Sequence, residues 1–76
     1  MTKNDFYKEL EAILGLPAGR ITGTETLDEL QGWDSLAMLS FIALADGSLG
    51  VIVSVAQLSA AKSVSDLVAM FPDKIT

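Results

Sequence analysis

Apolar residues recur at helical spacing in four stretches of the chain, and a residue suited to capping a helix precedes each stretch. In the first stretch the apolar positions form a single stripe: Phe6, Leu10, Ile13 and Leu14. Their spacing of three and four residues predicts a helix over residues 3–14. Thr2 provides its N-terminal cap and Gly15 its end.

The next two predicted helices lie in the middle of the chain. One runs over residues 35–45. The other is short and begins at Ser54, with Gln57 at the spacing of a capping box. We assign Val55 and Leu58 to the inner face of this short helix.

The last predicted helix begins at Ser63 and ends before Pro72, with an apolar stripe of Val64, Leu67, Val68 and Phe71. Residues 16–32 form a long connector, held to the core by its apolar positions: Ile21, Leu27 and Leu30. Residues 51–53 form an apolar plug before the third helix. The sum is one domain over residues 1–76, an all-α four-helix bundle with three longer helices and one short one.

The helix predicted over residues 35–45 is apolar on both sides. At 100° per residue one side contains Met38, Phe41, Ile42 and Ala45, and the other contains Leu36, Leu39 and Ala43. A domain of this size cannot surround one of its own helices, so one side must face outward. We expect a partner to bind the side that faces outward. The alternatives are an apolar face that is simply exposed to solvent and a homodimer interface.

The start of this helix differs from the other three. Asp34 is the N-terminal cap, and Trp33 and Met38 occupy the positions of a hydrophobic staple. Ser35 is then the first helical residue, beside amide groups that have no partner within the helix and at the positive end of the helix dipole. Such a position suits a phosphate group, although a serine there is more often only a good helix-start residue.

Composition restricts the chemistry of the chain. There is no cysteine and no histidine, so a thiol nucleophile, a thiolate metal site and the commonest general base are all missing. Five bases against ten acids give a net charge of −5, which argues against nucleic acid and anionic membranes as partners. The polar N-terminus lacks the layout of a signal peptide, and residues 46–50 interrupt the one long apolar run. We therefore expect a cytoplasmic protein that is not an enzyme.

The tripeptide Asp34-Ser35-Leu36 resembles the motif at which acyl carrier proteins receive 4′-phosphopantetheine. The resemblance extends over nearly the whole chain, through Gly50-Val51-Ile52 to Ser63-Val64-Ser65-Asp66-Leu67, which is similar to the Thr-Val-x-Asp-Leu of that family. It implies that a phosphopantetheinyl transferase moves the arm from coenzyme A to Ser35. The thiol of the arm would then hold acyl groups as thioesters and present them to acyl-loading and acyl-processing enzymes.

The resemblance also suggests roles for neighbouring residues. The motif and partner-docking residues would be Asp34, Leu36, Leu39, Ala43 and Asp46. In this family the interior can open to admit part of an acyl chain, and the candidates for its lining are Met38, Phe41, Ile42, Ile52, Leu58 and Leu67. These six residues would otherwise simply be core.

The sequence departs from the fatty-acid carriers in its charges. Acids are common along their second helix, whereas this chain has Ala37, Ser40 and Gly47 there. Most of its acids lie elsewhere, at Glu9, Glu11, Glu25, Asp28 and Glu29. Together with Trp33 before the motif, this favours a specialised acyl or aminoacyl carrier of fatty-acid, polyketide or related metabolism, free-standing and monomeric. The alternative is a small acidic adaptor that binds partners without being modified.

Overall fold

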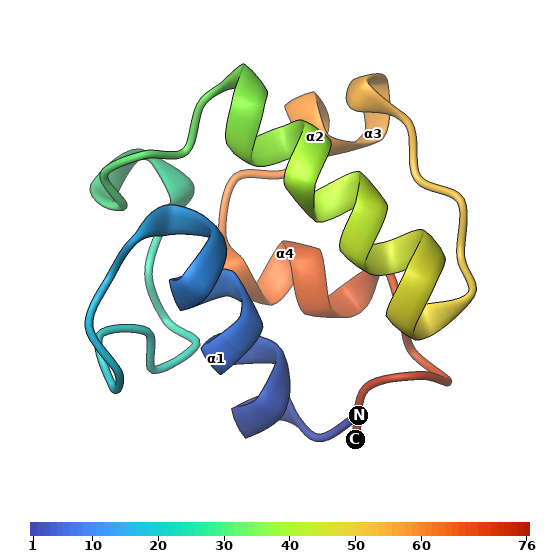
Figure 1. Ribbon diagram of the computed structural model, residues 1–76, viewed down its shortest axis with the longest axis horizontal. Coiled ribbons are helices and arrows are strands. Elements are labelled where there is room, and N and C mark those ends of the chain that lie inside the picture. Colours follow the sequence, from blue (N-terminus) through green and yellow to red (C-terminus); the bar gives the residue numbers. More distant parts are fainter.

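A computed structural model describes all residues from Met1 to Thr76 and contains four α-helices and no strand (Figure 1). In chain order the helical elements are α1 (Lys3–Leu14), the 3₁₀ turn η1 (Leu27–Glu29), α2 (Ser35–Leu44), the π-helical turn η2 (Ala45–Leu49), α3 (Val55–Ala60) and α4 (Val64–Ala69). The predicted all-α bundle is confirmed. None of these helices combines the length and the apolar character needed to cross a membrane.

Local capping starts the helices where the sequence predicted. The Thr2 hydroxyl accepts the Asp5 amide N–H at 3.1 Å, and α1 has the predicted bounds. At the start of α3 the Ser54 hydroxyl accepts the Gln57 amide N–H, while the Gln57 side chain accepts that of Ser54. Ser63 caps α4 in the same way. These bonds satisfy amide groups that have no acceptor within the first helical turn.

Two helix ends differ from the prediction. The chain does not leave its helical path after residue 45, because the turn η2 continues α2 as far as Leu49, which is buried. Gly50 then ends the turn with a φ of 68°, a conformation that favours glycine. At the other end of the chain, α4 is as short as α3. The amides of Met70 and Phe71 bond three residues back, so its last turn tightens into a 3₁₀ turn before Pro72.

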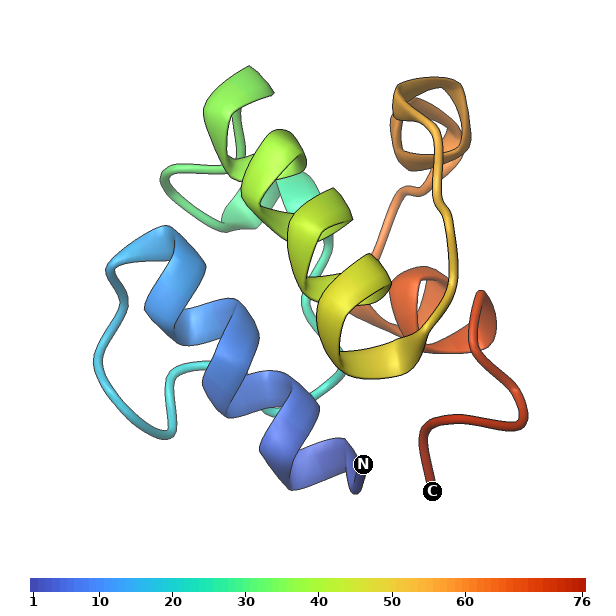
Figure 2. The ribbon, with the colours of Figure 1, turned by 45° about the vertical axis from the view of Figure 1, so that its right-hand side comes forward.

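Three phenylalanine rings form the centre of the core. Phe6 of α1, Phe41 of α2 and Phe71 beyond α4 have almost no exposed surface. Their ring centroids lie 5.9–6.3 Å apart, and the Trp33 ring meets Phe41 edge-on at 6.0 Å. Such pairs stabilise a fold by about 1 kcal/mol each beyond the burial of their area. Phe41 therefore joins α2 to both neighbouring parts of the bundle, and Figure 2 shows α2 lying between α1 and α3.

Two apolar residues near α3 face outward, contrary to the prediction. Val55, assigned to the inner face of the third helix, is 50% exposed. It is the first residue of the six-residue helix α3, and only Leu58 of this helix is buried in the core. Ile52 is 85% exposed. In the extended segment 51–53 successive side chains alternate in direction, and Val53 is the one that is buried. The predicted plug is therefore formed mainly by Val53.

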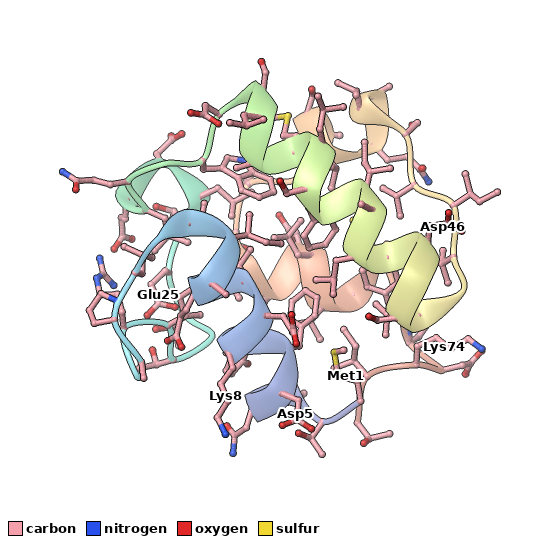
Figure 3. The ribbon with its side chains drawn as sticks, in the orientation of Figure 1. Met1, Asp5, Lys8, Glu25, Asp46 and Lys74 are labelled. Atoms are coloured by element: carbon pink, nitrogen blue, oxygen red, sulfur yellow. The ribbon has the colours of Figure 1, made fainter.

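Two buried carboxylates hold the long connector between α1 and α2. Glu11 is 4% exposed and accepts the Ile21 amide N–H at 2.8 Å. Glu25 is 8% exposed and accepts the amide N–H groups of Thr22 and Gly23 at 2.9–3.2 Å (Figure 3). Glu11 and Glu25 therefore do not contribute to the charged surface, because both carboxylates are used to hold backbone groups.

The connector is also joined to the far end of the chain. The amide of Leu27 bonds to the Lys62 carbonyl at 2.9 Å, and the amide of Val64 bonds to the Glu25 carbonyl at 3.0 Å. Ile21, Leu27 and Leu30 are buried as predicted, so the connector is part of the core.

The surroundings of Glu25 make the stability of the fold depend on pH. Burial by itself would raise the pKa of its carboxyl group, but the hydrogen bonds from Thr22 and Gly23 outweigh burial and lower the pKa from 4.5 to about 2. A carboxyl group with a lower pKa in the folded state stabilises that state fully above its unfolded pKa. This contribution is lost as the pH falls through the folded pKa.

We expect the Glu25→Gln substitution to lower the free energy of unfolding at neutral pH, by an amount of the order of 2 kcal/mol. The difference from the unsubstituted chain should shrink as the pH falls from about 5 towards about 2, and urea unfolding at a series of pH values measures it. Glu9→Gln, at an exposed position of α1, is the matched control and should change little. A difference that stays constant over this pH range would contradict the role given to the Glu25 charge.

Candidate functional site

The N-terminus of α2 is capped by a side chain that leaves the first helical residue free. The Asp34 carboxylate accepts the Ala37 amide N–H at 2.9 Å, and the Asp34 carbonyl accepts that of Met38 at 2.9 Å. Ser35 follows the cap and is exposed, and its hydroxyl makes no hydrogen bond within the chain. The predicted positions of the cap and of the first helical residue are confirmed.

The surroundings of Ser35 suit a phosphate ester on its hydroxyl. The Asp34 carboxylate accepts the amide N–H of Ala37 and of no other residue. The amide N–H groups of Ser35 and Leu36 therefore have no acceptor within the chain. They lie at the positive end of the α2 dipole, and both residues are open to solvent. A phosphodiester on Ser35 would therefore meet two free donors, a favourable dipole and no steric barrier.

The structure buries one side of α2 and exposes the other. On the inner side Phe41 and Ala45 are buried, and Met38 and Ile42 are half-buried against the core. The outer side is open to solvent: Leu36 is 73% exposed, Leu39 is 58% exposed, and Ala43 is also exposed. We call these three residues the outer face of α2.

The outer face of α2 has few charged residues near it. No residue of α2 itself is charged, so only Asp34 before the helix and Asp46 after it provide acids. Asp46 is exposed and lies at the opposite end of the helix from Ser35 (Figure 3). The outer face is consequently an apolar surface with one carboxylate at each end.

Sequence reasoning did not find the exposed apolar residues before and at the start of α3. Ile52 and Val55 are both at the surface, and the periodicity of residues 51–58 gave no indication of it. The side chains of Ile52 and Val55 point outward because those of their neighbours Val53 and Leu58 are buried. Four of the five large apolar residues that are exposed therefore belong to α2 or to the start of α3 and the segment before it: Leu36, Leu39, Ile52 and Val55. The fifth is Met1.

The candidates for an acyl pocket are divided by the structure. Met38 and Leu58 line a surface pocket of about 430 Å³, whose other apolar walls are Leu27, Trp33 and Ala61. The pocket therefore includes both members of the predicted hydrophobic staple.

The other four candidates do not line this pocket. Phe41 and Leu67 are fully buried core residues, and Ile42 is half-buried against that core. Ile52 points to solvent, so its assignment to the interior was wrong for the reason given above.

The structure thus combines an exposed serine at a capped helix start, where a phosphate ester would be favoured, with an uncharged apolar face of the kind that other proteins bind. A comparison with protein families identifies the class of this domain. Residues 5–71 match the family described as "Phosphopantetheine attachment site". The chain belongs to this family, and the resemblance to acyl carrier proteins is confirmed.

The prosthetic group of this family is 4′-phosphopantetheine, and its domains are carriers that are not themselves catalytic. Such carriers work with the enzymes that modify them and that handle their acyl groups. Searches of curated proteins and of solved structures found no match to the chain.

The cap of α2 can be tested apart from any modification. We expect Asp34→Ala to lower the free energy of unfolding by about 1 kcal/mol, because the Ala37 amide loses its acceptor. Asp34→Asn retains an oxygen in the same place and should stay within a few tenths of a kcal/mol of the unsubstituted chain. Thermal unfolding of the three proteins measures this, and equal losses in both variants would mean that the charge and not the cap matters.

Proposed function

We propose that this protein is a specialised acyl or aminoacyl carrier whose 4′-phosphopantetheine arm is attached to Ser35. One observation supports this assignment above the others. The Ser35 hydroxyl is exposed and unbonded at the first position of α2, and its motif Asp34-Ser35-Leu36 lies within the part of the chain that matches the family. The other serine of α2, Ser40, is also exposed, but it lies more than one turn inside the helix, where the amide groups are already bonded.

The proposed attachment is a phosphoryl transfer from coenzyme A. The Ser35 hydroxyl oxygen forms a bond to the phosphorus that bears the pantetheine, and the bond from that phosphorus to the rest of the nucleotide breaks. Adenosine 3′,5′-bisphosphate leaves, and the serine proton passes to a base of the transferase. The free amides of Ser35 and Leu36 then face the negative charge of the new phosphodiester.

The bound arm supplies the thiol that the chain lacks, and acyl groups are held on it as thioesters. Proton transfer and bond making are left to partner enzymes, which agrees with a chain that has no histidine and no cysteine. Tethering raises the local concentration of the acyl group at each enzyme that the carrier meets. We place this activity in the cytoplasm, in fatty-acid, polyketide or related specialised metabolism.

Partner enzymes would dock on the outer face of α2. Leu36 lies next to the attachment residue, and Leu39 and Ala43 continue the face along the helix. Because α2 itself has no charged residue, the partner surface should be mainly apolar, and electrostatic steering should contribute little. This is the basis for proposing a partner set separate from that of carriers with acidic second helices.

Intact-mass measurement tests the attachment. The purified chain is incubated with coenzyme A, Mg²⁺ and a broad-specificity phosphopantetheinyl transferase. We expect the mass of one phosphopantetheine to be added to the unsubstituted chain and to the Ser40→Ala control, and no addition to Ser35→Ala. If several transferases add no mass to the unsubstituted chain, the protein is better described as an unmodified adaptor that uses the same outer face.

Docking is tested by placing a charge on the outer face. We expect Leu39→Glu to slow modification by the transferase at least about tenfold, the effect of losing roughly 1.4 kcal/mol of docking free energy. Stability should stay within about 0.5 kcal/mol, because Leu39 is 58% exposed. Asn4→Glu adds the same charge at an exposed position of α1 and serves as the control. Unfolding of the Leu39→Glu chain, seen by circular dichroism, would show that the two sides of α2 had been exchanged.

A further inference from the structure

No pocket of the structure reaches the aromatic centre of the bundle. Phe6, Phe41 and Phe71 fill the region between α1, α2 and α4, and none of them lines a pocket. Leu58 and Leu67 close the same region from α3 and α4 and are fully buried. Protein interiors packed in this way resist the insertion of further methylene groups, because neighbouring side chains must leave their preferred rotamers.

The space that the structure does offer near Ser35 is the surface pocket of about 430 Å³. Trp33, two residues before Ser35, and Met38, three residues after it, both line this pocket. Residues three apart lie on the same side of a helix, and Met38 is only about 4.5 Å further along the axis of α2. A phosphopantetheine arm on Ser35 is much longer than this separation, so its thioester can fold back to the pocket.

The wall opposite α2 is partly polar, although Leu27, Leu58 and Ala61 also belong to it. It contains two hydroxyl side chains, Thr26 and Ser59, and two charged ones, Asp28 and Lys62. Asp28 and Lys62 make no ion pair with each other or with another residue, since the one ion pair of the structure joins Arg20 to Glu25. The backbone of Lys62 is held at both its polar groups, by the amide of Leu27 and by the carboxylate of Asp66. The base of the lysine side chain is thereby fixed beside the pocket.

A hydrocarbon chain in this pocket would cover polar groups without offering them hydrogen bonds, which costs free energy. An acyl group with a hydroxyl, keto or amino substituent would offer them partners. On the basis of the carrier function proposed above, we propose that the protein carries short acyl groups with a polar substituent. They are held between Trp33, Met38 and Lys62, while the aromatic core excludes long saturated chains.

The test compares three loaded forms of the carrier. The transferase attaches the arms of 3-hydroxybutyryl-, butyryl- and octanoyl-coenzyme A, and intact mass confirms each loading. Nuclear magnetic resonance spectra then compare each form with the carrier that bears the free thiol. We expect the 3-hydroxybutyryl form to shift the resonances of Trp33, Ser59 and Lys62 more than the butyryl form does. The octanoyl form should leave the ring resonances of Phe41 and Phe71 unchanged.

A pair of matched variants tests the polar wall. Lys62→Met removes the ammonium group but keeps a long side chain, and it should abolish the difference between the 3-hydroxybutyryl and butyryl forms. Lys74→Met makes the same change near the N-terminus (Figure 3), at a residue that does not line the pocket, and should preserve that difference. The emission of Trp33, the only tryptophan, provides a second measurement of the same effect.

The outcomes separate the two proposals. Octanoyl-induced shifts of Phe41 and Phe71 would overturn the exclusion of long chains, although the carrier function would stand. Equal shifts by 3-hydroxybutyryl and butyryl groups in the unsubstituted chain, or a difference that survives Lys62→Met, would overturn the preference for polar groups. A chain to which no arm can be attached would overturn the carrier function itself and this inference with it.

Discussion

The structure depends on the burial of one side of a helix that is apolar on both. Phe41 brings the inner side of α2 into contact with Phe6 and Phe71, so α2 cannot rotate without breaking the aromatic core. The outer side then has to face solvent, with Leu36 and Leu39 exposed. An exposed apolar face is a cost to a protein that works alone and an advantage to one that binds partners in turn. The requirement to bury Phe41 thus orients both the outer face of α2 and the first turn that contains Ser35.

A carrier must keep this first turn in place while other enzymes act on it, and the long connector before α2 contributes to that. Glu11 and Glu25 are buried and accept backbone amides within the connector. Hydrogen bonds to the Lys62 carbonyl and to the Val64 amide join the connector to the segment between α3 and α4. The approach to Asp34 is therefore fixed by contacts with distant parts of the chain as well as by its own cap.

The sequence predicts what local interactions decide. Helix starts depend on a capping side chain and an amide three residues away, so Thr2, Asp34 and Ser54 could be located before any coordinates were known. The motif around Ser35 was identified by its resemblance to acyl carrier proteins, because its position alone did not distinguish it from an ordinary helix start, and the match to the family agrees with it. By contrast, the burial of Glu11 depends on residues ten positions away.

Other features could not be predicted, because they depend on packing between elements. The outward direction of Ile52 follows from the burial of Val53. The pocket beside Met38 exists only because α2, α3 and η1 meet there. Its polar and apolar lining residues come from four separate parts of the chain.

The central claim is that one hydroxyl group, that of Ser35, bears the prosthetic arm. Fragmentation of the modified chain by tandem mass spectrometry tests it most directly, because it assigns the added mass to a single residue. The account predicts that every fragment bearing the phosphopantetheine includes Ser35 and that fragments without this residue have their unmodified masses. An arm found on any other serine or threonine would contradict it.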